Sequence, residues 1–552
     1  MFHSKPMEVI NKVLTDLGLT HLMDGFKGSS NSIMAFKVFL AFVMIVCSTN
    51  AANILMIPVP SHSHCLEMVG IANELVKRGH FVFAYVPVKF KTHCFDSSNV
   101  TVIDFHMSEE GWRRNEEFGD FVTKTVFGGR TLMNSEFPSK MNNLAESVCE
   151  GALSSTEELK KLQSLHIDIT LVDAMPLCNC LYYIPRFLKS PVVSVASAIF
   201  EGDSGMPFQT NTHPLLAVPY TSDMAYPQRF LNHLATVGFA FSLNVMNVFY
   251  QTDIDKLKKY VPADVFHIDK AQLIRQSVLF LENSDTILEY PKATFPNFLR
   301  VGGLTTRPTK PLPEELEKFM SQSKNGVVVV SFGSFLKNAP PYLFQKLLKV
   351  FQNLNHNVIM AYDKNENYGN VKTVKWLPQN DVLGHPNTVL FISHCGKNGF
   401  FEGFYHGVPI ICTPLHADTF STAIKVKYHK VGSSADILNG DANEILKVIK
   451  YTLNDENVRK NMKKASAIFH SAPFTPQERA ANGIEHVLKF GGDHLKPVSS
   501  KMSLIAHTML DIWFTLFLLT SIILYIFYRL IRGCFICIFC RKQNTTGKKK
   551  KD

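Results

Sequence analysis

The sequence lacks a large excess of charge outside its C-terminal end. The 552 residues carry a formal net charge of +10, and the last 24 residues supply seven of these charges through eight basic residues and one acidic residue. The remainder is nearly balanced, and it contains no basic stripe with interleaved aromatic residues, which is the usual footprint of a nucleic-acid-binding surface. We therefore expect no nucleic-acid partner.

Cysteine is sparse and irregularly spaced. Of the eleven cysteines, seven lie in the central part of the chain. This odd number does not predict a disulfide framework, although one bridge near Cys178 or Cys180 is compatible with an oxidising compartment. The run Cys534, Cys537 and Cys540 lacks the fourth ligand of a structural zinc site. We expect no metal site.

A first apolar run lies near the N-terminus. Residues 34–52 combine one lysine, an apolar stretch and a small-residue end at Ala51 and Ala52, which is typical of a secretory signal peptide. A buried helix or first strand is the alternative. Signal peptides normally begin at the initiator methionine, so either Met34 is the working start or residues 1–33 form an N-terminal extension.

A second apolar run lies near the C-terminus. Residues 512–528 are 17 uncharged, mostly apolar residues, which reach about 25 Å as a helix and predict a transmembrane helix. A buried core helix is the alternative. The basic tail, residues 529–552, predicts a cytosolic C-terminus and a lumenal body.

The last residues also suggest a location. Lys549 and Lys550 stand fourth and third from the end and resemble the dilysine retrieval signal of type I membrane proteins of the endoplasmic reticulum. A merely basic juxtamembrane patch is the other interpretation. We expect a single-pass protein of the endoplasmic reticulum membrane, glycosylated at Asn99, with lumenal catalytic domains.

The central part is too long for one ordinary core. Strand and helix patterns alternate through residues 53–300 and again through residues 301–490, with a proline-rich stretch near the boundary. The fold class is therefore α/β with two Rossmann-like domains. Residues 491–511 form a juxtamembrane segment.

The most informative stretch runs from Trp376 to Thr419. It contains two strand, turn and helix units in succession, and each strand ends in polar residues. In an open parallel sheet, ligands bind at the carboxyl ends of the strands, and the N-terminus of the following helix favours an anion. Gly396 and Gly399 would let a bulky group approach the backbone. This stretch predicts a diphosphate site.

The same stretch carries a family resemblance. Its pattern W-x-P-Q-N-D-x-L-x-H-P, then H-x-G-x-N-G-x-x-E-x-x-x-H-G-x-P, then P-L-x-A-D, closely resembles the signature of animal UDP-glycosyltransferases of the UDP-glucuronosyltransferase group. The resemblance implies the GT-B arrangement, in which two Rossmann-like domains face a cleft. It also implies a UDP-sugar, here UDP-glucuronate, as co-substrate without a further cofactor.

Glycosyl transfer needs a base that takes a proton from the acceptor hydroxyl. His64 is our candidate, because it follows the first strand and matches the family's S-H-x-L-x-M and R-G-H pattern; His62 is the rival. Asp173, at the end of the strand DITLVD, would hold the ring and stabilise the imidazolium. A helix cap is the alternative role for Asp173, and Asp168 lies at the wrong end of the strand.

For the donor, the resemblance implies stacking of Trp376 on uracil, Gln379 near the base or ribose, and Glu402 on the ribose hydroxyls. It assigns binding of the diphosphate to a set of residues that includes a histidine to offset the phosphate charge. They are His394, Gly396, Asn398, Gly399 and Ser334. It assigns the sugar to Asp418 and Thr419.

Two departures from the family pattern stand out. Thr419 replaces the usual glutamine, which puts the identity of the sugar in doubt. Cys395 replaces the usual second glycine and would add a side chain near the phosphates.

We therefore expect an inverting UDP-glucuronosyltransferase that acts on small lipophilic hydroxyl compounds, with a detoxification role. The alternatives are a UDP-glucosyltransferase and a catalytically weak binder of lipophiles or glycans. The sequence does not identify the acceptor, and a homo-oligomer is compatible with it.

Overall fold

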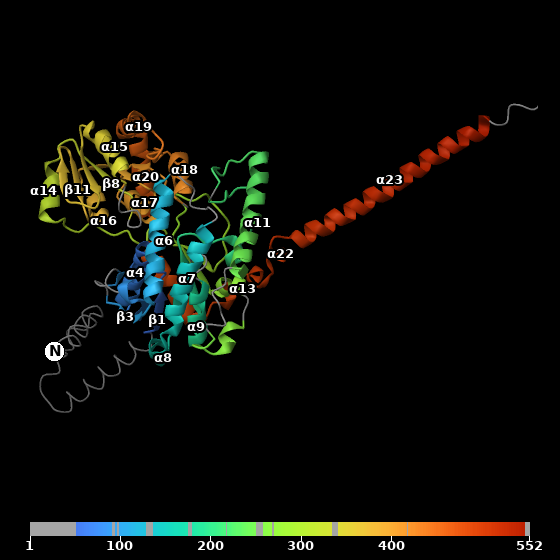
Figure 1. The fold of residues 1–552 in the computed structure, drawn as a ribbon, viewed down its shortest axis with the longest axis horizontal. Helices are drawn as coiled ribbons and strands as arrows, with labels where there is room; N and C mark the ends of the chain where they lie inside the picture. The colour runs from blue at the N-terminus through green and yellow to red at the C-terminus, as the bar shows by residue number, and fades with distance from the viewer. Residues whose placement is uncertain are drawn as a thin grey trace, which may run out of the picture.

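The computed structural model describes residues 51–90, 94–95, 99–128, 136–174, 179–216, 218–249, 258–267, 270–333, 340–416 and 418–546. Its body contains two α/β domains, each built on a seven-stranded sheet, and a long helix that leaves the body alone (Figure 1). Residues 1–50, and with them most of the expected signal peptide, lie outside the described residues.

All strands of the first sheet are parallel, in the order β3-β2-β1-β4-β5-β6-β7. They are β1 (Asn53–Ile57), β2 (Phe81–Pro87), β3 (Thr101–Phe105), β4 (Ile169–Asp173), β5 (Val192–Ala196), β6 (Leu279–Glu282) and β7 (Phe298–Arg300). The helices described in this domain are α4 (His62–Lys77), α6 (Glu109–Phe127), α7 (Phe137–Ser154), α8 (Thr156–Ser164), α9 (Tyr183–Leu188), α10 (Glu201–Ser204), α11 (Tyr226–Phe249) and α13 (Lys270–Leu273).

The second sheet has the order β10-β11-β9-β8-β12-β13-β14 and is parallel except for its edge strand β10. Its strands are β8 (Val327–Ser331), β9 (Asn357–Ala361), β10 (Glu366–Tyr368), β11 (Val371–Val374), β12 (Thr388–Ser393), β13 (Ile410–Cys412) and β14 (Gly432–Ser434). Its helices are α14 (Glu314–Gln322), α15 (Pro341–Gln352), α16 (Gln379–Leu383), α17 (Lys397–Tyr405), α18 (Thr419–Tyr428), α19 (Ala442–Asn454) and α20 (Glu456–His470).

The local sequence explains these elements. Every residue of β8, VVVVS, is buried, as expected for a strand covered on both faces. Helix α4 buries one apolar face against the sheet through Cys65, Met68, Ile71 and Leu75. The helix ends at Lys77 with Arg78 as its C-cap, and the φ of +92° at Gly79 suits a glycine just past a helix C-terminus.

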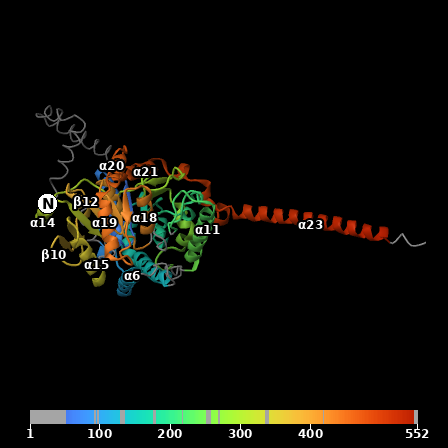
Figure 2. The same cartoon turned by 90° about the horizontal axis from the view of Figure 1, so that it is seen from above.

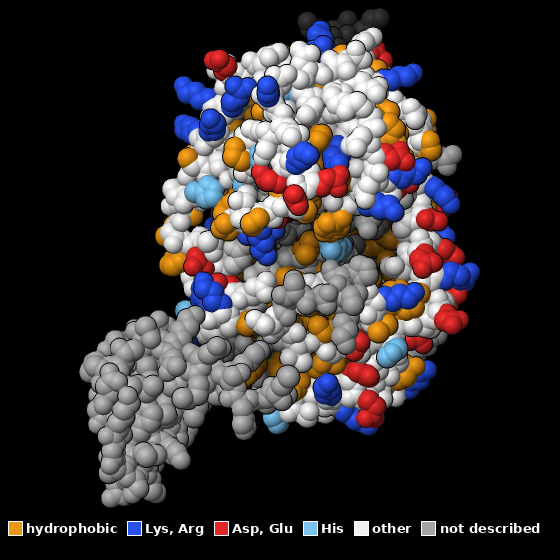
Figure 3. Space-filling view, turned by 90° about the vertical axis from the view of Figure 1, so that its left-hand side faces the viewer, with side chains coloured by type: hydrophobic (Ala, Val, Ile, Leu, Met, Phe, Trp, Pro, Cys, Tyr) orange, Lys and Arg blue, Asp and Glu red, His pale blue; other side chains and the backbone are white. Residues whose placement is uncertain are grey.

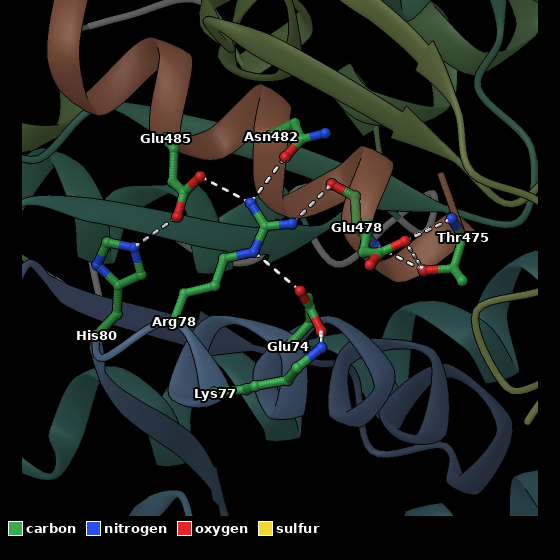
Figure 4. Close-up of polar contacts among 8 residues, drawn as sticks. All are labelled: Glu74, Lys77, Arg78, His80, Thr475, Glu478, Asn482 and Glu485. Carbon is green, nitrogen blue, oxygen red and sulfur yellow. Dashed lines mark hydrogen bonds and ion pairs between the residues drawn. The ribbon is translucent and has the colours of Figure 1, made fainter. Parts of the chain in front are cut away.

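Helix α21 (Pro476–Phe490) connects the second domain back to the first. Its apolar face joins the core beneath α4, β6 and β7. Arg78 donates to Asn482 and Glu485, each at 2.7 Å, and His80 Nε2 lies 3.2 Å from Glu485 (Figure 4). The sequence placed residues up to 490 with the second domain, but α21 packs on the first because its apolar face completes that core.

After α21, the chain reaches α22 (Leu504–His507) and α23 (Leu510–Thr546). Within the described residues, Leu510–Cys537 is the one helical stretch long and apolar enough to cross a membrane, and its apolar window is wholly exposed. Figures 1 and 2 show α23 projecting alone from the body. This exposure argues against a buried core helix, and the stretch extends beyond the expected 512–528.

The sequence indicated no disulfide framework, and this expectation is wrong, although the one bridge considered, near Cys178 or Cys180, is present at Cys180. Three bridges join Cys65 to Cys94, Cys149 to Cys180, and Cys395 to Cys412. The odd number of seven arises from Cys178, which lies outside the described residues. Spacing along the chain could not reveal the pairs, because the fold brings together cysteines that are 17 to 31 residues apart.

Candidate active site

The cleft lies between the two domains, and Figure 3 shows the molecule hollowed between them, with hydrophobic side chains and a histidine in the hollow. Strands β1 and β4 are neighbours in register, with Ile57 opposite Val172, so both end at this cleft. His64, in the first turn of α4, and Asp173, the last residue of β4, are thereby brought together. His64 Nδ1 lies 2.8 Å from Asp173 Oδ2.

The charges around His64 make it a strong base. Burial of the ring lowers its pKa, but the charge and hydrogen bond of Asp173 outweigh burial, and Glu67 and Asp418 add to the effect, so the pKa is raised to about 9. Asp418 belongs to the second domain, so His64 is within electrostatic reach of the opposite wall of the cleft. Because Nδ1 is engaged by Asp173, Nε2 is the nitrogen that can accept a proton.

The competing candidates lie elsewhere. His62 also begins α4, and its ring lies 6.0 Å from that of Trp376, edge to face. Asp168 accepts a hydrogen bond from the backbone N–H of Asn53 at 2.8 Å, at the opposite end of the first sheet.

The N-terminus of α17 faces the cleft after β12. Gly396 caps it without a side-chain hydrogen bond, and its first turn holds no acidic residue, so its positive end remains available to an anion. A Cβ atom at Gly396 would lie 2.5 Å from His394 Nε2, so this glycine makes room for the ring. Burial and the charge of His416 lower the pKa of His394 to about 3.

The lowered pKa leaves the ring of His394 neutral in the structure, so the ring offers an N–H group to the cleft. A hydrogen bond from this ring and the N-terminus of α17 are both available to bind a phosphate.

Asn398 bridges the domains. Its Nδ2 donates to the backbone oxygen of Ser63 at 3.2 Å, and its Oδ1 accepts from Asn283 at 2.8 Å. Asn283 also donates to Glu67 at 2.8 Å. The structure therefore ties the expected diphosphate residue to the segment that holds His64.

A buried ion cluster continues this contact. Lys397 donates to the backbone oxygen of Ser197 and lies 3.6 Å from Glu289, and Lys425 also binds Glu289. Glu289 follows β6 in the first domain, whereas both lysines belong to the second. The pKa of Glu289 is lowered, because the two lysines outweigh the effect of burial. Three buried charges thus join the domains behind α17.

The expected nucleotide residues surround α16 and α17. Gln379 donates to Glu402 at 2.7 Å, and a Cβ atom at Gly399 would lie 3.2 Å from Gln379 Nε2. Burial raises the pKa of Glu402 to about 7. Trp376 is 65% exposed, so its face is open for stacking.

Asp418 and Thr419 have different surroundings. Asp418 is half-buried near His64 and His416. Thr419 is fully buried, and its hydroxyl accepts from the N–H groups of Leu415 at 3.2 Å and His416 at 3.1 Å and donates to the His416 carbonyl. We therefore do not place Thr419 on the sugar, because the turn before α18 uses its hydroxyl. Ser334 lies outside the described residues.

Cys395 has a different role from the one expected. It is fully buried, and its bridge to Cys412 joins the ends of the neighbouring strands β12 and β13. Its side chain thus points into the domain and fixes the loop before α17, instead of facing the phosphates.

Sequence reasoning missed Glu67, Asn283, Glu289 and the two lysines. One signal was readable: Glu67 lies three residues after His64 on a helix whose buried face is otherwise apolar. The partners of Glu289 lie more than one hundred residues away in the other domain, so no local pattern points to them.

Comparison with known proteins identifies the class. The structure resembles crystal structures of the glycosyltransferase of kitacinnamycin (TM-score 0.54, 18% identity, covering 79% of this chain and 99% of that one) and of CalG4, the calicheamicin glycosyltransferase (TM-score 0.53, 18% identity, covering 80% and 98%). These likenesses confirm the GT-B fold of a glycosyltransferase.

The chain belongs to the UDP-glucoronosyl and UDP-glucosyl transferase family, whose model matches residues 52–551. It is 30% identical to human UDP-glucuronosyltransferase 2B17 over 517 residues, covering 89% of this chain and 94% of that protein. It is 29% identical to rat UDP-glucuronosyltransferase 2B1 over 547 residues, covering 94% of this chain and all of that protein. The chain is therefore an enzyme that transfers a sugar from a UDP-sugar.

Proposed function

We propose that this enzyme is an inverting UDP-glucuronosyltransferase that acts on hydroxyl groups of small lipophilic compounds. The observation that carries the proposal is the 2.8 Å pair of His64 and Asp173 in the cleft that α17 also faces. The relatives named above are UDP-glucuronosyltransferases, which favours glucuronate as the sugar. The family description also includes glucosyl transfer, so a UDP-glucosyltransferase is the second candidate.

In the proposed reaction, Nε2 of His64 accepts the proton of the acceptor hydroxyl while that oxygen attacks the anomeric carbon. The bond from this carbon to the UDP oxygen breaks on the opposite face, so a single displacement inverts the configuration. Asp173 stabilises the imidazolium that forms. The N-terminus of α17 and the N–H of His394 stabilise the charge that develops on the departing UDP.

The donor would lie along the second domain. Trp376 stacks on uracil, Glu402 accepts hydrogen bonds from the ribose hydroxyls, and Gln379 orients Glu402 through the hydrogen bond already present. Asp418 takes the sugar hydroxyls, because it belongs to the second domain and lies within electrostatic reach of His64.

We also propose that α23 anchors the enzyme in the endoplasmic reticulum membrane with both domains in the lumen. Three disulfides within the domains fit an oxidising compartment, and the basic tail fits the cytosol. Protease added to intact microsomes should remove only the short tail. Digestion of the domains without detergent would contradict this orientation.

The test of the activity is turnover of a generic phenol by microsomes containing this chain, with UDP-glucuronate, UDP-glucose and UDP-N-acetylglucosamine as donors. Microsomes with the His64→Ala variant provide the background. We expect the highest kcat/KM with UDP-glucuronate. Preference for UDP-glucose would support the second candidate, and UDP binding without turnover of any donor would indicate a binder.

A further inference from the structure

Helix α11 carries an exposed apolar face that the activity does not explain. Its 24 residues contain a single charged residue, Arg229. Four large side chains on its outer face are more than half exposed: Tyr226 (70%), Phe230 (53%), Leu231 (53%) and Leu234 (53%). Their spacing places them on one side of the helix, and a row of this kind on a soluble surface marks an interaction site.

The opposite side of α11 packs on the protein, so the exposed row is not a misplaced core. Asn232 is fully buried and donates from its side-chain nitrogen to the carbonyls of Thr210 and His213, each at 2.8 Å. Thr236 and Ala240 are buried on the same inner side. The helix is therefore held firmly with its apolar face outward.

The segment before the anchor helix is docked on the first domain. Arg275 donates to the carbonyl of Met502 at 2.6 Å, and Ser499 donates to the carbonyl of Gly205 at 2.6 Å. Leu504 is buried and lines a small cavity together with Thr236 and Ala240 of α11. These contacts fix the point at which α23 leaves the body, and that point lies next to α11.

The arrangement of the two helices gives the direction of the bilayer. Both Figure 1 and Figure 2 show α11 at the edge of the body from which α23 departs, and Figure 1 shows its axis running across this edge. Ile505 of α22 and Met509, the residue just before α23, add two further apolar side chains that are each 53% exposed. The exposed row of α11 thus continues the apolar surface of the anchor.

We propose that the outer face of α11 lies in the interface of the bilayer that α23 crosses, as a second membrane contact made by the first domain. A helix with large apolar side chains on one face binds a membrane in this orientation, with that face among the headgroups and upper acyl chains. This inference rests on the proposed anchoring by α23.

The test uses the full chain in nanodiscs of phosphatidylcholine, with or without bromine on the acyl chains, since bromine quenches tryptophan at short range. In a Trp112→Phe, Trp376→Phe background, Trp513 in α23 is the one remaining tryptophan and reports on the anchor. When Trp513→Phe is added, Phe230→Trp reports on α11, and Tyr451→Trp is the matched control, because Tyr451 is a 63% exposed aromatic residue on α19 of the second domain.

We expect brominated lipid to quench the tryptophan at position 230 by more than about half and the one at position 451 by less than about a tenth, given the shallow depth of interfacial helices. Quenching of Trp513 without greater quenching at 230 than at 451 would overturn the inference and leave the anchor standing. Quenching at neither Trp513 nor 230 would overturn both. Protection at 230 that depends on protein concentration would assign the face to a second copy instead, against the proposal.

Discussion

The charge of Asp173 should set the pH at which the enzyme works. His64 has a pKa of about 9 because Asp173 lies against Nδ1, whereas burial alone would lower it below the ordinary value of 6.5. A base must be deprotonated to act, so kcat/KM should fall about tenfold per pH unit below 9, since this parameter reports the free enzyme. The fraction of neutral His64 at pH 7 is then about 1%.

Replacement of Asp173 by asparagine keeps the shape and removes the charge. The acid limb of the kcat/KM profile should move from about 9 to lower pH, because the group that raises the pKa of His64 most has lost its charge. The plateau above the limb should fall by about 10²- to 10⁴-fold, because the imidazolium loses its partner. Asp168→Asn is the matched control, because Asp168 lies just before the opposite end of β4 from Asp173. This variant should change neither the acid limb nor the plateau of the kcat/KM profile.

The same pair contributes to stability, with a sign that provides a second check. The pKa of His64 is higher in the folded state than in the unfolded state, so the stabilisation is complete below pH 6.5 and is lost as pH rises through about 9. Its size is about 3 kcal/mol at most, from 1.36 kcal/mol per pKa unit. Asp173→Asn should therefore lower the melting temperature more at pH 6 than at pH 10. An acid limb that stays near 9 in Asp173→Asn would refute the reasoning.

Three other changes test the surroundings of the site. Thr419→Val should lower the free energy of unfolding by about 1–3 kcal/mol in a thermal unfolding assay, because two N–H groups of the turn lose their acceptor. Thr419→Ser keeps the hydroxyl and should retain most of this stability. An equal loss of stability in both variants would contradict the role of Thr419 in the turn. Glu289→Gln should lower the free energy of unfolding by about 3–5 kcal/mol, because it leaves two buried lysines without a counter-charge. Glu315→Gln, at the exposed partner of Lys372, should leave the melting temperature nearly unchanged. Similar melting temperatures for the two variants would count against a buried cluster. The affinity for UDP, measured by calorimetry, should fall as pH drops below about 7, because Glu402 then becomes neutral. The Glu402→Gln variant should bind UDP weakly at every pH. An affinity of the wild type that does not change with pH would contradict the contact between Glu402 and the ribose.

The overall architecture could be predicted from the sequence because it depends on local patterns. The buried run at β8 and the apolar strands that end in polar residues predict parallel sheets, and the GT-B arrangement is confirmed by the solved glycosyltransferases. The R-G-H pattern was useful as a signature, and the structure supplies its reason: Arg78 and His80 hold α21 against the first domain.

Two errors arose in the loops that follow the neighbouring strands β12 and β13. The sequence suggested that the side chain of Cys395 lies beside the phosphates, but it forms a disulfide with Cys412, the last residue of the neighbouring strand β13. The sequence suggested that Thr419 binds the sugar, but its hydroxyl is hydrogen-bonded to the backbone of the preceding turn. Neither contact could be predicted from the sequence, because each depends on the backbone conformation that these loops adopt.

The most direct test of the account is the comparison of His64→Ala with His62→Ala. His64 contacts Asp173, whereas the ring of His62 lies against Trp376. We expect His64→Ala to lose about 10²-fold or more in turnover while its affinity for UDP, measured by calorimetry, changes less than about twofold, because the base acts on the acceptor. His62→Ala should keep most of its turnover. Turnover of His64→Ala within about threefold of wild type would contradict the assignment of His64 as the base.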